Sequence, residues 1–274
     1  MLIDTKNNVD ALILCAGRGE RLLPFTRLLP KPLMPIQGRP ILEYWLCLLK
    51  SSGVTRIFIN VHHLADEISK MISSIVNDDL EIILLHEDIM LGTGGTIGHY
   101  RDLFKNDLLI IHGDNYGLFD LRPFISFHKH LKQKDSSKFS LMTFTTDTPQ
   151  TCGIFEQDHL GKILTFDEKP SETRSNVANA AVYLLNAEQL EIIKKNNVED
   201  LSVDFLSKYY LDANLWHFDD QYMDVGNIEY LRKANFLILN LPQNLVSNEW
   251  LKGYQELCLN IFNNEELILK HLKN

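Results

Sequence analysis

LILCAGRGERLLPFTRLLPKPL, residues Leu12 to Leu33, is the stretch from which the rest of the chain can be interpreted. It begins in an apolar run that ends in a turn containing Gly17 and Gly19, which predicts a buried strand followed by a loop. Glycines allow backbone N–H groups to approach an anion, and Arg21 adds a guanidinium group suited to phosphate oxygens. The stretch therefore has the composition of a phosphate-binding loop.

Lys31 stands between Pro30 and Pro32 in the same stretch. Prolines on both sides restrict the backbone, so the ammonium group can be directed at a target with little ordering cost. A glycine turn with solvated arginines is also common on protein surfaces. The turn lacks the third glycine of a dinucleotide-binding motif and the Gly-Lys-Ser/Thr ending of a P-loop. What favours a functional interpretation is the combination of strand, turn, arginine and proline-flanked lysine.

These elements resemble the signature of the sugar-1-phosphate nucleotidylyltransferases, also called nucleoside-diphosphate-sugar pyrophosphorylases. In that family a Gly-x-Gly-x-Arg-Leu turn precedes Pro-x-Thr and Pro-Lys-Pro-Leu, and the same elements occur here at 17–22, 24–26 and 30–33. The resemblance implies that Arg21 and Lys31 are catalytic. It also implies a nucleotide-binding set made of Cys15, Ala16, Gly17 and Gly19.

Composition limits the class of protein. The chain has 274 residues, 45% of them hydrophobic and 23% charged, which predicts one large domain or one domain with an appendage. A net charge of −9 argues against general nucleic-acid binding. The four cysteines are far apart and form no Cys-x-x-Cys pair, so reduced thiols are expected. Without a signal sequence or an apolar run of about 18 residues, we expect a cytoplasmic protein with no membrane span.

Apolar strands alternate with helical patterns in the first part of the chain. Helices are expected at 40–50 and 64–76, and strands at 56–61 and 80–85, an alternation that predicts a parallel sheet covered on both faces. The resemblance implies an α/β protein with the Rossmann-like nucleotidyltransferase fold, in which a mixed, mostly parallel sheet is flanked by helices. Later elements are expected at 108–115 (strand), 121–134 (helix), 139–145 (strand), 153–155 and 163–166 (hairpin), 177–185 (strand), 201–206 (start of a helix), 213–218 (strand) and 228–240 (helix).

Two units are expected along the chain. Residues 1–240 would form the nucleotidyltransferase domain, with a nucleotide half at about 8–135 and a sugar-phosphate half at about 136–240. Residues 241–274 would form a C-terminal helical appendage of one or two helices, used for packing or self-association, so that a homo-oligomer is possible. No hexapeptide period of a left-handed β-helix occurs in that part.

A second glycine cluster follows the strand expected at 80–85. Ligands of open α/β sheets gather at the carboxyl ends of strands, so this loop should face the same crevice as the first glycine turn. The family has a similar Leu-Gly-Thr-Gly loop, and the resemblance implies that Gly92, Thr93 and Gly94 contact the nucleoside. A flexible connection is the alternative. Glu87 lies near the expected base pocket and could accept a pair of hydrogen bonds from guanine, which favours GTP, although uridylyl enzymes also have acidic residues in this region.

Two aspartates are candidate metal ligands. Asp114 follows an apolar strand that breaks at Gly113, where a carboxylate is placed to coordinate Mg²⁺, although a helix-capping role is also common. The resemblance implies that Asp114 binds the metal together with Asp224, which stands in an Asp-x-Gly turn. An ordinary turn aspartate is the alternative for Asp224. Two carboxylates far apart in sequence should then converge on one Mg²⁺.

The resemblance also implies a sugar-phosphate site. Glu-Lys-Pro at 168–170 is followed by an Asn-Ala-Ala strand, as in the sugar half of the family. The residues implied for this site are Gly153, Glu168, Lys169 and Asn179. Outside such a motif a surface Glu-Lys pair is usually only solvated charge.

The implied reaction is in-line attack by a sugar-1-phosphate oxygen on the α-phosphorus of a nucleoside triphosphate, which gives an NDP-sugar and pyrophosphate. The attacking phosphate is already an anion, so positioning and charge neutralisation are the expected contributions of the protein. Alternatives are a uridylyl-, thymidylyl- or cytidylyltransferase acting on another phosphorylated small molecule, and a non-catalytic regulatory homologue that binds nucleotide sugars. The enzyme is favoured because Arg21, Lys31, Asp114 and Asp224 are all present.

Overall fold

A mixed sheet forms the centre of the molecule. The computed structural model describes residues 9–76, 79–117, 119–135, 138–220, 222–236 and 244–264. Within these residues nine strands belong to one sheet. They are β1 (Val9–Leu14), β4 (Arg56–Val61), β5 (Glu81–His86), β6 (Asp107–His112), β8 (Phe139–Thr145), β9 (Gly153–Gln157), β10 (Ile163–Glu168), β11 (Val177–Leu185) and β12 (Ala213–His217).

The strand order is β5–β4–β1–β6–β11–β8–β12, with the β9–β10 hairpin attached beside β11. The neighbours β5, β4, β1 and β6 are parallel, β11 runs antiparallel to both β6 and β8, and β12 is parallel to β8. The mixed, mostly parallel sheet expected from the sequence is therefore confirmed. Parallel order directs the carboxyl ends of β1, β4, β5 and β6 to the same edge, where their loops can form a site.

Helices cover both faces of the sheet, as β1 illustrates. Ala11 and Ile13 belong to one apolar core and Leu12 to the other, and all three are fully buried. Successive strand residues point to opposite faces, so a strand buried on both faces is an unbroken apolar run. The first core also receives side chains of α1 (Ile41–Ser51), α2 (Ala65–Ser73), α4 (Leu121–Lys134) and α8 (Asn248–Phe262). The second receives those of α3 (Thr93–His99) and α5 (Ala187–Lys195).

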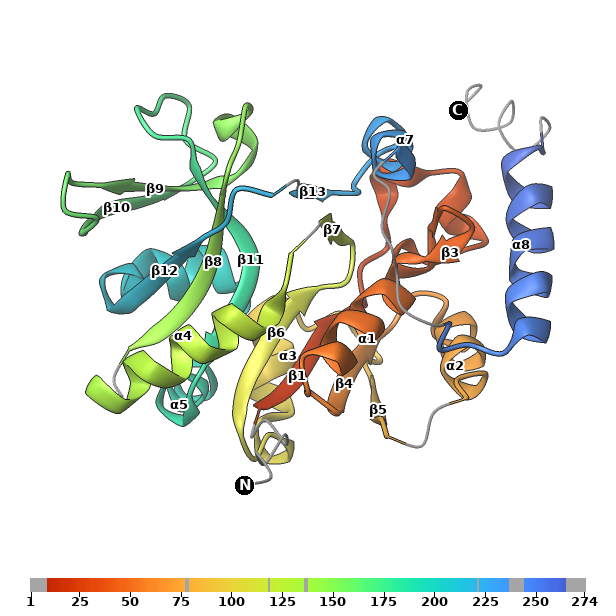
Figure 1. Ribbon diagram of the computed structural model, residues 1–274, viewed down its shortest axis with the longest axis horizontal. Coiled ribbons are helices and arrows are strands. Elements are labelled where there is room, and N and C mark those ends of the chain that lie inside the picture. The colour runs from red at the N-terminus through yellow and green to blue at the C-terminus, as the bar shows by residue number, and fades with distance from the viewer. Residues whose placement is uncertain are drawn as a thin grey trace.

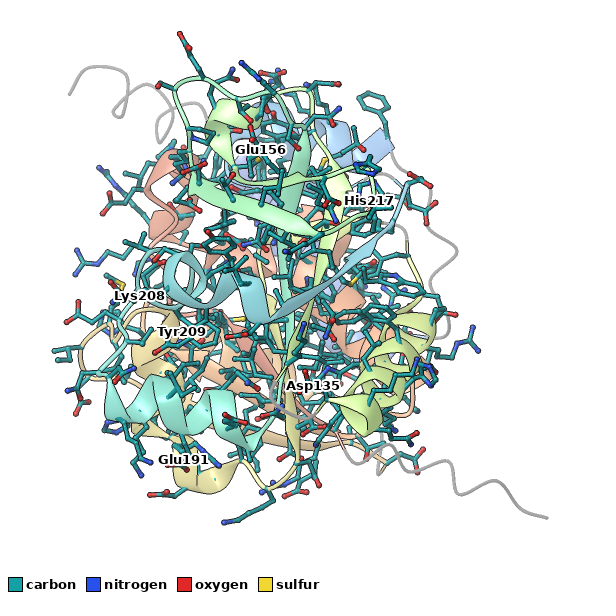
Figure 2. All side chains as sticks on the ribbon, turned by 90° about the vertical axis from the view of Figure 1, so that its left-hand side faces the viewer. Asp135, Glu156, Glu191, Lys208, Tyr209 and His217 are labelled. Atoms are coloured by element: carbon teal, nitrogen blue, oxygen red, sulfur yellow. The ribbon has the colours of Figure 1, made fainter. Side chains whose placement is uncertain are left out.

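The elements predicted from periodicity agree with the structure within a few residues, and α4 has the predicted bounds. Helix α5 was not predicted, although its start carries a capping box in which the Asn186 N–H donates to Gln189 Oε1 over 3.3 Å. The helix expected from residue 201 begins as a π-helix, Leu201–Leu206, and continues as α6 (Ser207–Tyr209). In Figure 2, where the left-hand side of Figure 1 faces the viewer, Tyr209 of α6 lies above Glu191 of α5.

Two small ribbons stand outside the main sheet. One consists of β2 (Pro35–Ile36) and β3 (Arg39–Pro40), and the other of β7 (Asn115–Gly117) and β13 (Tyr222–Asp224). The second ribbon joins segments that are far apart in sequence, and its register places Asp224 opposite Asn115. Short 3₁₀ turns occur at Glu20–Leu22, Phe25–Arg27, Lys31–Leu33, Arg101–Leu103, Pro149–Thr151 and Tyr210–Asp212.

The C-terminal part is helical. Helix α7 (Ile228–Phe236) confirms the start of the helix expected at 228–240, whereas its expected end and the domain boundary at 240 lie outside the described residues. Helix α8 follows and packs at the end of the molecule that also holds α2, away from the β9–β10 hairpin (Figure 1). In the part of the chain that is described, no helix is long and apolar enough to cross a membrane.

Candidate active site

The first glycine turn follows β1 and folds around Thr26. Gly19 has a φ of +65°, and a Cβ atom there would lie 2.7 Å from the Thr26 methyl carbon, so only glycine fits without a shift. The Thr26 hydroxyl donates to the Gly19 carbonyl over 3.0 Å. Gly17 is exposed and has open space around it. The turn is therefore held at Gly19 and open to solvent at Gly17.

Lys31 begins the 3₁₀ turn Lys31–Leu33 and is only 7% exposed. Pro30 is extended before it, and the Leu33 N–H donates to the Pro30 carbonyl over 2.8 Å. This tight turn fixes the direction of the lysine side chain, as the flanking prolines predict.

The Lys31 ammonium group is the centre of a cluster of four charged side chains. It donates to Asp114 Oδ2 and, over 3.0 Å, to Asp224 Oδ1. The other oxygen of Asp224 accepts from Arg21 Nη2 over 2.9 Å. The structure thus brings together the two residues predicted to be catalytic and the two predicted to bind metal, from three separate segments of the chain.

Backbone pairing explains how Asp224 reaches this position. Asp114 follows β6, and its carbonyl accepts a hydrogen bond from the Val225 N–H over 3.0 Å. Beside it, Gly226 allows the guanidinium group to approach, since a Cβ atom there would lie 2.7 Å from Arg21 Nη2. Gly226 is a site residue that the sequence analysis did not assign, although the Asp-x-Gly pattern was the available signal.

The ion pairs decide the charge states in the cluster. Burial alone would lower the pKa of the Lys31 ammonium group, but Asp114 and Asp224 raise it above its usual value. Burial alone would raise the pKa of the Asp114 carboxyl group, but Lys31 and His112 lower it. Lys31 is therefore a cation and Asp114 an anion at neutral pH.

The donor set of this cluster fits a magnesium ion. Mg²⁺ prefers oxygen ligands and is usually held by one or two carboxylates, with water and substrate phosphates completing its shell. Asp114 and Asp224 are two such carboxylates that share one ammonium group. Within the described ranges no group of three or more His, Cys, Asp or Glu side chains is placed to hold a metal ion.

Glu87 supports the second glycine loop from inside. It is 6% exposed, and its Oε1 atom accepts from Asn60 over 2.9 Å and from the Thr96 hydroxyl over 2.6 Å. Its Oε2 atom accepts from the Leu91 N–H over 3.1 Å. Both carboxylate oxygens thus accept hydrogen bonds within the protein, so Glu87 holds the loop, and its predicted contact with the base stays a prediction.

The glycines of this loop meet the segment before residue 201. A Cβ atom on Gly92, whose φ is +81°, would lie 2.5 Å from the Glu199 carbonyl oxygen. The same oxygen accepts from the Gly94 N–H over 2.8 Å, and the Thr93 hydroxyl accepts from the Leu201 N–H over 2.8 Å. Close backbone packing is thus a physical reason for Gly92 and Gly94, beside the predicted nucleoside contact.

Cys15 and Ala16 are buried at the end of β1. The Cys15 N–H donates to the Asn60 amide oxygen over 2.6 Å, and burial raises the pKa of the Cys15 thiol well above its usual value. Asn60 in turn contacts Glu87, so the two glycine loops are linked through a single amide side chain. This link between β1 and β5 was not predicted.

On the sugar side, Gly153 and Glu168 are paired across the β9–β10 hairpin. A Cβ atom on Gly153 would lie 2.7 Å from Glu168 Oε2, so glycine makes room for the carboxylate. That oxygen is buried and has no hydrogen-bond partner in the described part of the chain, and burial raises the pKa of the Glu168 carboxyl group. Lys169 has a φ of +50°. Its side chain is 65% exposed, and its Nζ atom lies 3.7 Å from Glu168 Oε1.

Asn179 lies at an irregular point of β11, where the register shifts between Asn179 and Tyr183. Its amide donates to the Tyr183 hydroxyl over 2.8 Å and accepts from the Ala181 N–H over 2.9 Å. The Tyr183 hydroxyl also interacts with Ser202 and lies near Glu168 and Asp200, all of which affect the pKa of Tyr183. Ser202 and Asp200 are neighbours of this site that no sequence motif indicated.

His112 is the last residue of β6 and precedes Asp114 by two positions. Burial lowers the pKa of its ring, and the charges of Asp114, Asp224 and Asp200 only partly oppose this effect. Its Nε2 atom is buried and has no hydrogen-bond partner among the described residues.

Comparison with known proteins gives the family. A family model described as nucleotidyl transferase matches residues 10–240. The chain is 30% identical over 243 residues to a UTP–glucose-1-phosphate uridylyltransferase of Synechocystis sp., with 80% of this chain and 61% of the relative covered. This chain therefore belongs to the nucleotidyl transferase family.

A second relative and a solved structure agree with this placement. The chain is 28% identical over 192 residues to the bifunctional protein GlmU of Methanocaldococcus jannaschii, covering 70% of this chain and 43% of the relative. A Bacillus anthracis protein described as a candidate glucose-1-phosphate thymidylyltransferase, in complex with a sucrose, superposes with a TM-score of 0.75 at 25% identity. That match covers 86% of this chain and 98% of the solved one. The chain spans about three fifths or less of the length of these two curated relatives.

Proposed function

We propose that this protein transfers a nucleoside monophosphate from a nucleoside triphosphate to a sugar-1-phosphate, releasing pyrophosphate and an NDP-sugar. The observation that carries the proposal is the convergence of Arg21, Lys31, Asp114 and Asp224. Attack of one phosphate on another needs neutralisation of negative charge and exact placement, which fixed cations supply.

Lys31 would act as the fixed cation at the α-phosphate. It is nearly buried, it is held by two carboxylates, and its raised pKa keeps it charged. Arg21 has a side chain that is 68% exposed, so it can turn from Asp224 to the outer phosphates of the triphosphate when these arrive. No general base is required, because the attacking phosphate oxygen is already an anion.

Asp114 and Asp224 would hold Mg²⁺ together with phosphate oxygens of the substrates. When bound, the ion supplies positive charge that draws these phosphates together. The carboxylates of Asp114 and Asp224 would then face both the ion and the Lys31 ammonium group, to which they already accept hydrogen bonds.

The sugar-1-phosphate would bind on the side of Gly153, Glu168, Lys169 and Asn179. The buried Oε2 of Glu168 has no hydrogen-bond partner among the residues that the structure describes, so it can accept from a sugar hydroxyl, which would remove the cost of an unpaired acceptor. The exposed Lys169 ammonium group can reach an incoming phosphate. One N–H of the Asn179 amide is bonded to Tyr183, and its oxygen accepts from Ala181. Asn179 would contact the sugar through the second N–H or the second lone pair of that oxygen.

The base stays open. GTP remains a prediction from the sequence. The carboxylate of Glu87, on which that prediction rests, already accepts hydrogen bonds within the protein. The cytoplasmic location, a homo-oligomeric state and the division into units at residue 240 likewise stay predictions.

A panel that pairs each nucleoside triphosphate with several sugar-1-phosphates tests the proposal. Each reaction is run with and without Mg²⁺, and released pyrophosphate is measured. We expect at least one pair to release pyrophosphate in a manner that needs both substrates and the ion. A folded protein that releases none with any pair would contradict the proposed function.

A further inference from the structure

Helix α8 contacts the loop that carries Lys31. The hydroxyl group of Tyr254, a residue that is 4% exposed, donates to the Leu33 carbonyl over 2.6 Å. Leu33 ends the 3₁₀ turn that Lys31 begins. A buried carbonyl needs such a donor, so this contact ties the lysine turn to a helix more than 200 residues later in the chain.

Two further contacts join α8 to the same segment. The ring of Phe262 stacks on that of Phe25, with centroids 4.5 Å apart and an angle of 16° between the rings. The Gln255 amide donates to the Gly38 carbonyl over 3.1 Å. One helix thus holds the segment at Phe25, before Lys31, and at Leu33 and Gly38, after it.

The start of α8 is itself firmly attached. The N–H groups of Leu245 and Val246 donate to Glu43 Oε1 over 2.9 and 3.3 Å, and Glu43 is fully buried on α1. The Ser247 N–H donates to the Ser74 carbonyl over 2.9 Å, and its side chain caps the helix at Trp250. A helix fixed to α1 and α2 in this way is a rigid support.

We propose that α8 is a positioning element for the active site, and that Tyr254 is a positioning residue that keeps the Lys31 turn in place through the Leu33 carbonyl. The part that concerns catalysis rests on the proposed function. A fixed ammonium group stabilises charge without reorganisation, and small displacements of such a group lower the rate steeply. The role of α8 is therefore more specific than the packing or self-association expected from the sequence.

Tyr254→Phe tests this with the loss of one hydroxyl group. Tyr209→Phe is the matched control, because the wild-type Tyr209 hydroxyl also takes part in one hydrogen bond, accepting from Asn196 over 3.1 Å. Tyr209 lies on the side of the molecule that faces the viewer in Figure 2, and α8 lies at the opposite end in Figure 1. Phe262→Leu serves as a second variant that keeps an apolar side chain. Hydrogen exchange of the Leu33 and Met34 amides and steady-state kinetics are measured for each protein, both on the full chain.

We expect Tyr254→Phe and Phe262→Leu to speed the exchange of these amides by about threefold to tenfold, the range of one lost hydrogen bond, and to lower kcat by a similar factor while KM is unchanged. Tyr209→Phe should change neither. Unchanged exchange in both variants would overturn the positioning role, and so would faster exchange with wild-type kcat. If the wild type releases no pyrophosphate with any pair, the proposed function fails, and exchange alone then decides whether α8 holds the turn.

Discussion

At the scale of single residues, Lys31 shows how the fold keeps a charge nearly out of water. A buried ammonium group is costly unless it is paired, and here two carboxylates face it. The prolines on either side could be interpreted from the sequence, because their effect is local. The partners could not be derived from spacing, since Asp114 and Asp224 arrive from distant segments; only the resemblance to a family indicated them.

Gly226→Ala tests how closely the guanidinium group must approach Asp224. The added Cβ atom would lie 2.7 Å from Arg21 Nη2 and 2.8 Å from Asp224 Oδ2. Both atoms end mobile side chains, so we expect the free energy of unfolding to change by less than about 0.5 kcal/mol while kcat/KM falls about tenfold.

Gly253→Ala is the control for that variant, because a Cβ atom at this position of α8 meets no atom within 4 Å. Urea unfolding and pyrophosphate release are compared for the two variants. Equal kcat/KM in Gly226→Ala and wild type would show that the contact of Arg21 with Asp224 has no part in the reaction.

At the scale of elements, most strands and helices of the main sheet were predicted, whereas α5 and the ribbon of β7 and β13 were not. Helix α4 was expected over its observed range because its apolar residues recur with helical spacing and its basic residues gather at its C-terminal end. The ribbon of β7 and β13 has three residues in each strand, too few for a pattern, yet it brings Asp224 to the site. The hydrogen bonds of Glu87 with Asn60 and Thr96 were not predicted either, because these partners are brought together by tertiary packing.

Helix α4 is joined to the sheet by an ion pair whose stability should depend on pH. Lys132 donates to both oxygens of Asp107 over 2.6 and 2.8 Å. Burial alone would raise the pKa of the Asp107 carboxyl group, but His128 and Lys132 lower it below its usual value of 3.8. A lowered pKa means that the pair contributes stability above about pH 4 and loses it as the pH falls through the folded-state value.

Asp107→Asn should therefore lower the free energy of unfolding by about 1 kcal/mol near pH 7, and by less near pH 3, which lies below the ordinary pKa of 3.8 at which the unfolded chain takes up the proton. Urea unfolding of both proteins at the two pH values measures this. The same difference at both values would mean that the charge of Asp107 is not what joins α4 to the sheet.

At the scale of the whole molecule, one sheet carries both sides of the proposed site. The carboxyl ends of the parallel strands hold the glycine loops and Asp114, while β11 and the β9–β10 hairpin hold Asn179, Glu168 and Lys169. Helix α8 contacts the turn that begins at Lys31 through the hydrogen bond from Tyr254 to the Leu33 carbonyl. The α/β architecture was predictable from alternating patterns and the resemblance, whereas the support from α8 depends on contacts that no local pattern encodes.

The most direct test of the central claim is pyrophosphate release by Lys31→Ala, measured with the substrate pair that the panel selects. Turnover of Lys31→Ala should fall about a hundredfold or more while the variant still folds, because the fixed cation at the α-phosphate is lost. Lys194→Ala is the control, since Lys194 pairs with Asp102 over 3.0 Å outside the charged cluster and should keep wild-type turnover. Wild-type pyrophosphate release by Lys31→Ala would contradict the account.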